Sequence, residues 1–297
     1  MNPRNGLPFT VEGSLPSLTD PVLIVQFSGW IDASGAAAAA MELISAESSS
    51  KRLITFDPDT FIDYRARRPT MELREGVNTN IEWSLPELRV GNDSRGRDVV
   101  LLTGPEPDTA WNFFADPVGE LAQQLHISRM VGLGAYPFGA PHTRPVGITA
   151  TSADPTVIDR LDLSRSTLDA PAGVQSVLEH VFHRRGIEAV SLWAQVPHYV
   201  ASMAYPLASA ALVQALCADT GLSFDSSRLR RESAVQRERL DQLVANNPDH
   251  ASMLGQLENA YDELHGPPID DAEPDIPTVD ELAAEVEQFL RDQQPGA

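Results

Sequence analysis

One candidate for ligand chemistry is a short turn, Ser28 to Asp32, which follows a buried strand predicted over residues 22–27. Gly29, Trp30 and Asp32 lie in this turn, and open α/β sheets usually bind ligands at the carboxyl ends of their strands. The turn lacks the spaced glycines of a dinucleotide loop and the Gly-Lys-Ser/Thr of a phosphate loop. Asp32 could instead cap the following helix by accepting hydrogen bonds from free backbone N–H groups, and this is the more common role for such a residue.

A second pair of candidates, Glu106 and Asp108, directly follows a strand predicted over residues 99–103. Two carboxyl groups near a strand end could act as general acid and base if their surroundings separated their pKa values. The alternative is a rigid, solvated turn before the helix that carries Trp111. We favour the turn, because nothing in the sequence identifies a side that faces a substrate.

The third cluster is the stretch from Gly132 to Pro145, where glycines and prolines are dense. This density predicts a loop of fixed shape, which carries Tyr136, His142 and Arg144. His142 with Arg144 could bind an anion or transfer a proton, and stiff loops on rigid scaffolds often carry sites. An equally good interpretation is a stiff crossover between two strands, with Arg144 paired to an acid.

Other side chains do not complete a catalytic set. His180 and His183 lie three residues apart on a predicted helix, but no third ligand is nearby, so we expect no metal site. No Gly-x-Ser-x-Gly elbow supports a serine nucleophile, and the single cysteine, Cys217, lies in an apolar helix where a thiol is usually inert. We therefore expect no catalytic residues and no cofactor, and we favour a non-enzymatic role while leaving enzymatic activity open.

Composition limits the partners of the chain. Its 297 residues carry a net charge of −20 and a single lysine, Lys51, so its surface field repels phosphate backbones and anionic membranes. We expect no nucleic-acid partner, no membrane span and no signal sequence, and hence a cytoplasmic protein. Against this acidic background, Arg65, Arg67 and Arg68 form a local basic patch, which suggests an ion pair or a subunit contact.

Alternating strand and helix patterns must position these residues. Short runs rich in apolar and β-branched side chains predict strands at residues 22–27, 52–57, 99–103, 130–135 and 189–194. Helical patterns separate several of them, at residues 33–45, up to 126, and at 171–185 and 207–218. This alternation predicts a mixed, mostly parallel sheet covered by helices on both faces. Between residues 61 and 90 the pattern suits antiparallel strands, so we expect an insertion at one end of the sheet.

Composition also divides the chain into three expected parts. Residues 1–224 form the predicted α/β core. Residues 225–265 are charged and helix-forming, and Asn247-Pro248 supplies a cap and a first-turn proline, so they predict a helical hairpin appendage. Residues 266–297 predict an acidic, proline-containing linker and a terminal amphipathic helix. This helix begins with a capping box formed by Thr278 and Glu281.

Five motifs occur in order along residues 20–225: Phe27 to Ala33, Phe61 to Pro69, Leu102 to Pro107, Gly132 to Pro145 and Trp193 to Tyr199. Together they resemble the proteasome assembly chaperone family of the second-chaperone type, and more narrowly its bacterial, actinobacterial members. The resemblance implies a three-layer α/β/α core like that of nucleoside phosphorylases and related hydrolases. It also implies self-association and, in eukaryotic and archaeal members, binding to proteasome subunits during assembly.

Besides the simple possibility of a stable homo-oligomer whose loops only make subunit contacts, two hypotheses follow from the residues and the resemblance. The leading one is a non-enzymatic assembly or interaction protein, with further copies of the chain and proteasome subunits as its candidate partners. The competing one is a small-molecule binding protein, or a hydrolase- or phosphorylase-like enzyme, in which Asp32, Glu106, His142 and Arg144 share one pocket. They differ in whether the loops at the strand ends face a common ligand or another subunit.

Overall fold

The computed structural model describes residues 8–161 and 163–265, so the linker and terminal helix expected at 266–297 lie outside the described residues. The chain divides into two compact units, Met1–Glu258 and Asn259–Ala297. Of the second unit the structure describes only the last residues of helix α8 (Pro248–His265).

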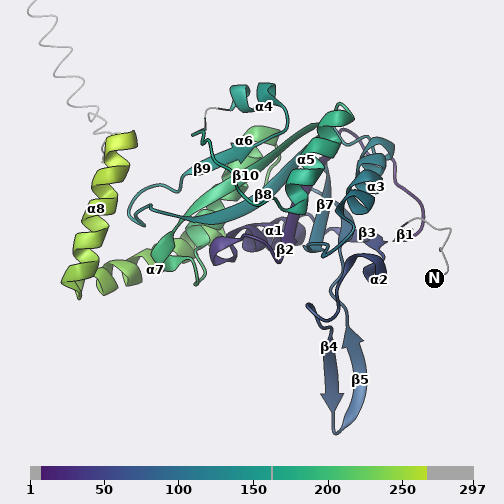
Figure 1. Ribbon diagram of the computed structural model, residues 1–297, viewed down its shortest axis with the longest axis horizontal. Coiled ribbons are helices and arrows are strands. Elements are labelled where there is room, and N and C mark those ends of the chain that lie inside the picture. Colours follow the sequence, from purple (N-terminus) through teal and green to yellow (C-terminus); the bar gives the residue numbers. More distant parts are fainter. Residues whose placement is uncertain (1–7, 162, 266–297) are drawn as a thin grey trace, which may run out of the picture. The chain divides into compact units, whose positions relative to one another are not determined.

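An eight-stranded mixed sheet forms the centre of the first unit, in the order β1-β3-β6-β7-β2-β8-β10-β9 (Figure 1). Four consecutive strands within it are parallel: β7 (Asp98–Pro105), β2 (Val22–Ser28), β8 (Arg129–Phe138) and β10 (Glu188–Pro197). Antiparallel strands complete the two edges: β6 (Glu87–Asn92), β3 (Lys51–Phe56) and β1 (Phe9–Val11) on one, and β9 (Ile148–Thr151) on the other. The predicted mixed, mostly parallel sheet is confirmed.

Helices cover both faces of this sheet. One core contains side chains of α1 (Ala36–Glu47) and α6 (Pro206–Thr220), and the other contains those of α3 (Trp111–Gln124) and α5 (Val174–Arg184). Side chains alternate between the faces along each strand, so Ile24 of β2 belongs to the first core and its neighbours Leu23 and Val25 to the second. The expected α/β/α layering is confirmed.

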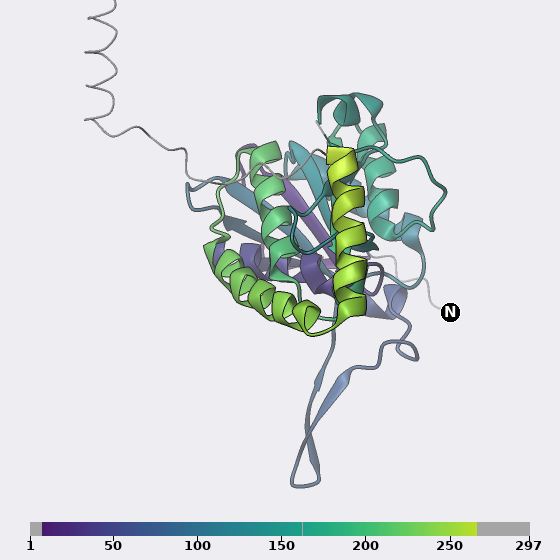
Figure 2. The same ribbon diagram turned by 90° about the vertical axis from the view of Figure 1, so that its left-hand side faces the viewer.

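Two helices follow α6, as the sequence predicts (Figure 2). In α7 (Ser227–Ala245), Leu229 and Leu240 are buried in the same core as α6. The start of α8 is capped by Asn247, whose side-chain oxygen accepts a hydrogen bond from the backbone N–H of Asp249 at 3.0 Å. The first compact unit extends through α7, and the domain boundary expected at residue 225 stays a prediction.

A separate two-stranded sheet, β4 (Thr70–Arg74) and β5 (Val77–Glu82), extends away from the main sheet (Figure 1). It is the antiparallel insertion that the sequence predicts between residues 61 and 90. Met71 pairs with Ile81, and Leu73 lies two residues further along β4. The register shifts between Glu72 and Leu73, but the extra residue, Thr79, is on β5, so alternation along β4 keeps these three side chains on one face of the ribbon. All three are exposed. We call this surface the hairpin face.

Candidate functional site

The turn after β2 is fixed to the core by Asp32. Its carboxylate accepts hydrogen bonds from the backbone N–H groups of Ala37, at 2.8 Å, and Ala38, at 3.0 Å, in the first turn of α1. Burial raises the pKa of Asp32, and the hydrogen bonds from the backbone oppose this change. The backbone of Asp32 also bridges to Ala135 of β8. The carboxylate therefore caps the helix, as favoured from the sequence.

Gly29 allows the same turn to approach the guanidinium group of Arg67. Its φ is +105°, and a side chain at this position would overlap Arg67. Arg67 donates from Nη1 to the carbonyl oxygen of Ser28, at 3.1 Å, and from Nε to a carboxylate oxygen of Asp108, at 2.9 Å. The other carboxylate oxygen of Asp108 accepts the backbone N–H of Asp63. Arg67 thus forms an ion pair of the kind that the arginine patch suggests, and it ties the segment before β4 to the ends of β2 and β7.

Glu106 bonds to a different part of the molecule from Asp108. Its side chain is buried, and one carboxylate oxygen accepts the backbone N–H of Val174, at the start of α5, at 2.6 Å. A side chain at Gly173, one residue earlier, would contact both Glu106 and Trp30. Because the carboxyl groups of Glu106 and Asp108 are bonded to separate elements, their geometry does not support a cooperating acid and base.

The stretch from Gly132 to Pro145 is not a single loop, so this expectation is wrong for its first half. Strand β8 continues to Phe138 and stays in register with β10 along its whole length. Gly134 provides room for the indole ring of Trp193, which faces it from β10. Gly134 therefore serves close packing between neighbouring strands, and the loop between β8 and β9 begins only after Phe138.

The side chains of Tyr136 and Arg144 are engaged in bonds within the protein. The hydroxyl of Tyr136, in β8, accepts a hydrogen bond from the side-chain amide of Gln195 at 3.1 Å and lies 3.3 Å from the hydroxyl of Thr149. Arg144 lies 3.3 Å from a carboxylate oxygen of Glu258. The interpretation in which Arg144 pairs with an acid is therefore confirmed.

His142 is enclosed between its loop and helix α7. Its side chain is 0% exposed, with Nδ1 lying 2.7 Å from the hydroxyl of Tyr199 and Nε2 lying 3.1 Å from a carboxylate oxygen of Asp241. Burial raises the pKa of Tyr199 to about 12, so this hydroxyl stays protonated. Sequence reasoning missed both partners, because Tyr199, in the short helix η2 (His198–Val200), and Asp241 are distant in sequence and follow no common pattern.

Replacement of His142 with alanine is expected to lower the free energy of unfolding by about 1–3 kcal/mol, because the buried ring and its contacts with the Tyr199 hydroxyl and Asp241 are lost. The hydroxyl of Tyr199 keeps only the hydrogen bond from the backbone N–H of residue 142, at 2.8 Å. Chemical denaturation followed by circular dichroism measures this loss. The matched control is His198→Ala, which removes an exposed ring one residue from Tyr199 and should change stability by no more than about 0.5 kcal/mol. Equal losses of stability in the two variants would show that the enclosed side chain of His142 does not stabilise the fold.

Glu179 is a buried carboxyl group that the sequence does not indicate. It is 4% exposed and accepts hydrogen bonds from the hydroxyl groups of Ser191 and Thr151. Burial raises the pKa of Glu179, and these hydrogen bonds oppose the change. The native state therefore holds this proton more tightly than the unfolded chain. The contribution of the proton to stability is present below the unfolded pKa and is lost as the pH rises through the native one.

The variant Glu179→Gln should show this dependence, because glutamine resembles the protonated acid and does not ionise. We expect the free energy of unfolding of the variant, relative to the wild type, to rise as the pH increases from about 4 to about 7. Urea denaturation at a series of pH values measures the difference. A difference that stays constant, or that falls with pH, would show that Glu179 ionises as readily in the native state as in the unfolded chain.

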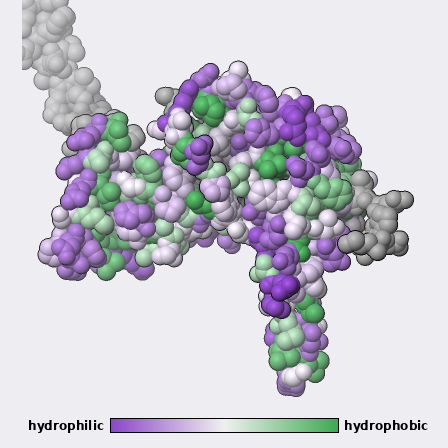
Figure 3. Space-filling view, in the orientation of Figure 1, coloured by the Kyte–Doolittle hydropathy of each residue, from purple (hydrophilic) through white to green (hydrophobic). Residues whose placement is uncertain are grey.

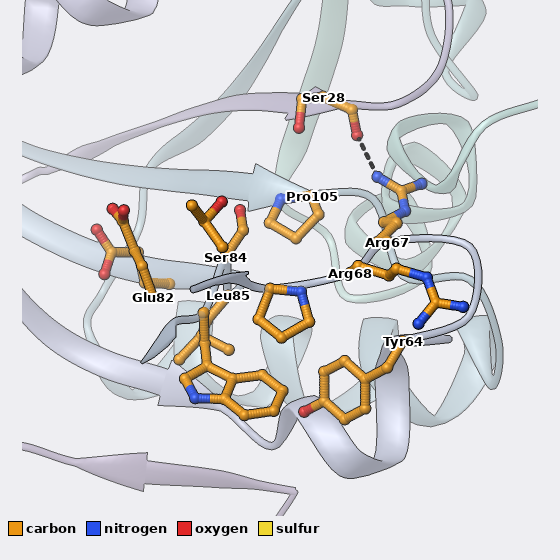
Figure 4. Close-up of a pocket in the computed structure, with 12 residues that line it drawn as sticks. Ser28, Tyr64, Arg67, Arg68, Glu82, Ser84, Leu85 and Pro105 are labelled. Atoms are coloured by element: carbon orange, nitrogen blue, oxygen red, sulfur yellow. Dashed lines mark hydrogen bonds between the residues drawn. The ribbon is translucent and has the colours of Figure 1, made fainter. Parts of the chain in front are cut away.

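A cavity of about 560 Å³ opens at the base of the hairpin, beside the carboxyl ends of β2 and β7 (Figure 4). The residues around it include Ser28, Tyr64, Arg67, Arg68, Glu82 and Trp83. The rings of Tyr64 and Trp83 meet edge to face, with their centres 4.8 Å apart. We call this space the hairpin-base cavity.

The enzyme hypothesis requires Asp32, Glu106, His142 and Arg144 to line one cavity, and the four do not together line either of the two that the structure describes. His142 lines a second one, of about 220 Å³, between α6 and α7, whereas Asp32, Glu106 and Arg144 line neither. Within residues 8–161 and 163–265, no group of three or more histidine, cysteine or acidic side chains is placed to hold a metal ion. Nor does any helix in these ranges have the length and apolar character needed to cross a bilayer.

A family model described as the PAC2 family matches residues 26–244 of the chain. No curated protein matches it. A PAC2 family protein from Streptomyces avermitilis, of known structure, is 31% identical with a TM-score of 0.72, and the match covers 79% of this chain and 100% of that one.

Two solved structures from Mycobacterium tuberculosis are also similar. A protein of unknown function has a TM-score of 0.80 and 29% identity, and the match covers 89% of this chain and 93% of that one. A proteasome-assembly chaperone homologue has a TM-score of 0.73 and 26% identity, and the match covers 78% of this chain and 99% of that one.

Proposed function

This chain belongs to the PAC2 family, because the family model matches residues 26–244. We propose that it is a non-enzymatic assembly protein that docks through the hairpin face. The proposal places a second copy of the chain on this face. Proteasome subunits are the further partners.

The hairpin face carries the argument for docking. A two-stranded ribbon is marginally stable by itself in water, and both strands of this one are separate from the main sheet. Met71, Leu73 and Ile81 nevertheless expose apolar side chains on one side of it, and the space-filling view shows hydrophobic residues along the ribbon (Figure 3). An exposed apolar surface on an extended ribbon is typical of a protein interaction site. The free strand edges add backbone groups that can pair with another chain.

The bonds made by the candidate site residues favour docking over catalysis. Asp32 caps α1, Glu106 bonds the start of α5, Asp108 holds Arg67, and His142 is enclosed by Tyr199 and Asp241. Each polar group thus has a structural partner within the chain. A general acid, base or nucleophile must instead reach a substrate atom.

Candidate partners follow from the comparison with the mycobacterial proteins. The relative described as a proteasome-assembly chaperone homologue is similar over nearly its full length. This similarity supports proteasome subunits as partners of the present chain.

Two measurements test the proposal. Light scattering of the purified chain should give a mass of at least two copies, and a monomer at micromolar concentration would overturn the self-association. Purified proteasome subunits mixed with the chain should elute with it in size-exclusion chromatography. If the chain self-associates but elutes separately from isolated and from partly assembled proteasome subunits, the proposed binding to proteasome subunits would be overturned.

A further inference from the structure

We propose that the hairpin-base cavity binds a small monocarboxylate that carries an aromatic ring. This inference concerns a ligand site and does not require that the hairpin face docks on any partner. It rests on the position of the cavity, on two arginines with N–H groups free to bind, and on the aromatic wall beside them.

The cavity lies where its fold favours a ligand. Ser28 and Pro105, the last residues of the parallel neighbours β2 and β7, pair with one another at its edge. Ligands of open α/β sheets bind outside the carboxyl ends of such strands. Its volume of about 560 Å³ is within the range of small-molecule sites, which is about 300–1,000 Å³.

The two arginines supply donors of different kinds, one held in place and one exposed and unbonded among the described residues. Arg67 is held by its bonds to Ser28 and Asp108, which use two of the five N–H groups of a guanidinium. Arg68 makes no hydrogen bond and no ion pair with any residue that the structure describes. Figure 4 shows both side chains on the same side of the cavity. The fork of an arginine matches the two oxygens of a carboxylate.

The acidic residues around the cavity restrict the charge of the ligand. The negative charge of Glu87 is compensated by two ion pairs. Its carboxylate oxygens lie 2.8 Å from Nη1 of Arg89 and 3.6 Å from Nη1 of Arg52. Glu82 has no ion pair among the described residues, and Figure 4 places it on the side opposite the arginines. A ligand with a single negative charge can approach Arg68 with less repulsion from Glu82 than a phosphate with two. The lining therefore favours a carboxylate.

The aromatic wall selects the rest of the ligand. Trp83 and Tyr64 pack edge to face beside the cavity. The indole of Trp83 is still exposed, which leaves apolar surface at the rim of the cavity. An aromatic group on the ligand can stack there, or meet the indole edge to face, while its carboxylate reaches the arginines. The ligand would thus make an apolar contact through its ring and a charged contact through its carboxylate, a combination that is common in small-molecule sites.

Titration calorimetry on the full chain tests the ligand class with four probes. Hippurate has a ring and one carboxylate, hippuramide replaces the carboxylate with an amide, N-acetylglycine lacks the ring, and phenyl phosphate carries the larger charge. We expect hippurate to bind saturably and at least about tenfold more tightly than each of the others. No binding of hippurate, or equal binding of hippuramide, would overturn the site. Tighter binding of phenyl phosphate would overturn the carboxylate assignment.

A pair of variants locates the site. Arg68→Gln should weaken hippurate binding about tenfold or more, and it should leave folding unchanged because Arg68 has no partner among the described residues. Arg65→Gln removes an exposed arginine from the same segment that does not line the cavity, and it should leave binding unchanged. Equal affinities for Arg68→Gln and the wild type would overturn the proposal. The mass of each protein, measured in parallel, reports separately on self-association.

Discussion

Replacement of Ile81 with lysine is expected to weaken the self-association of the protein by about 30-fold to 1,000-fold. Ile81 is 42% exposed and lies opposite Met71 on the hairpin face, so the new charge would lie within the proposed contact between copies. Loss of a central apolar contact in an interface commonly costs about 2–4 kcal/mol, and each 1.4 kcal/mol is about a tenfold change in affinity. Sedimentation velocity over a range of concentrations measures the shift toward the monomer.

The matched control is Asn80→Lys, one residue earlier on the same strand. Side chains alternate along a strand, so this lysine points to the opposite face, where it is paired with Glu72. The control adds the same charge to the same strand and should retain self-association. Neither substitution touches the two buried cores, so circular dichroism should be unchanged in both. Equal dissociation of the two variants, or of neither, would rule out the hairpin face as the contact.

Replacement of Phe114 with alanine is expected to lower the free energy of unfolding by about 3–5 kcal/mol, the usual cost of removing a buried phenylalanine. The ring of Phe114 is 0% exposed, and its centre lies 4.5 Å from that of Phe56, 5.2 Å from Phe61 and 5.9 Å from Phe27. Its removal would open a cavity where α3 meets the sheet. Denaturation by guanidinium chloride measures the loss.

Phe113 provides the control for this substitution, because it lies beside Phe114 on the same helix but is 54% exposed. Phe113→Ala removes the same atoms from the adjacent position of the helix, where the ring contacts only the edge of the cluster at Phe61, and it should cost about 1–2 kcal/mol. A loss for Phe114→Ala no larger than that for Phe113→Ala would show that the aromatic cluster does not stabilise this layer.

The layers of the fold were predictable because each depends on a local pattern. Apolar runs such as residues 22–27 identify buried strands, and helical patterns between them imply parallel pairing. The change of pattern after Phe61 marks the inserted hairpin for the same reason. These signals need only neighbouring residues, so one sequence is enough to read them.

The contacts of the candidate site could not be predicted in the same way. His142 meets Asp241 and Arg67 meets Asp108 across long separations in sequence, and no periodicity connects them. The loop predicted around Gly134 was wrong for a related reason. A glycine can provide a turn or leave room for a large neighbour, and only the position of Trp193 decides between these roles.

The separation of the hairpin from the main sheet has an evolutionary consequence. No residue of β4 or β5 belongs to either buried core, so selection on the hairpin is largely independent of selection on the stability of the fold. Substitutions on Met71, Leu73 or Ile81 can therefore accumulate without unfolding the protein. Paralogues that share the α/β/α layers could diverge in partner choice through this ribbon alone, and a hairpin exchanged between them would carry its specificity with it.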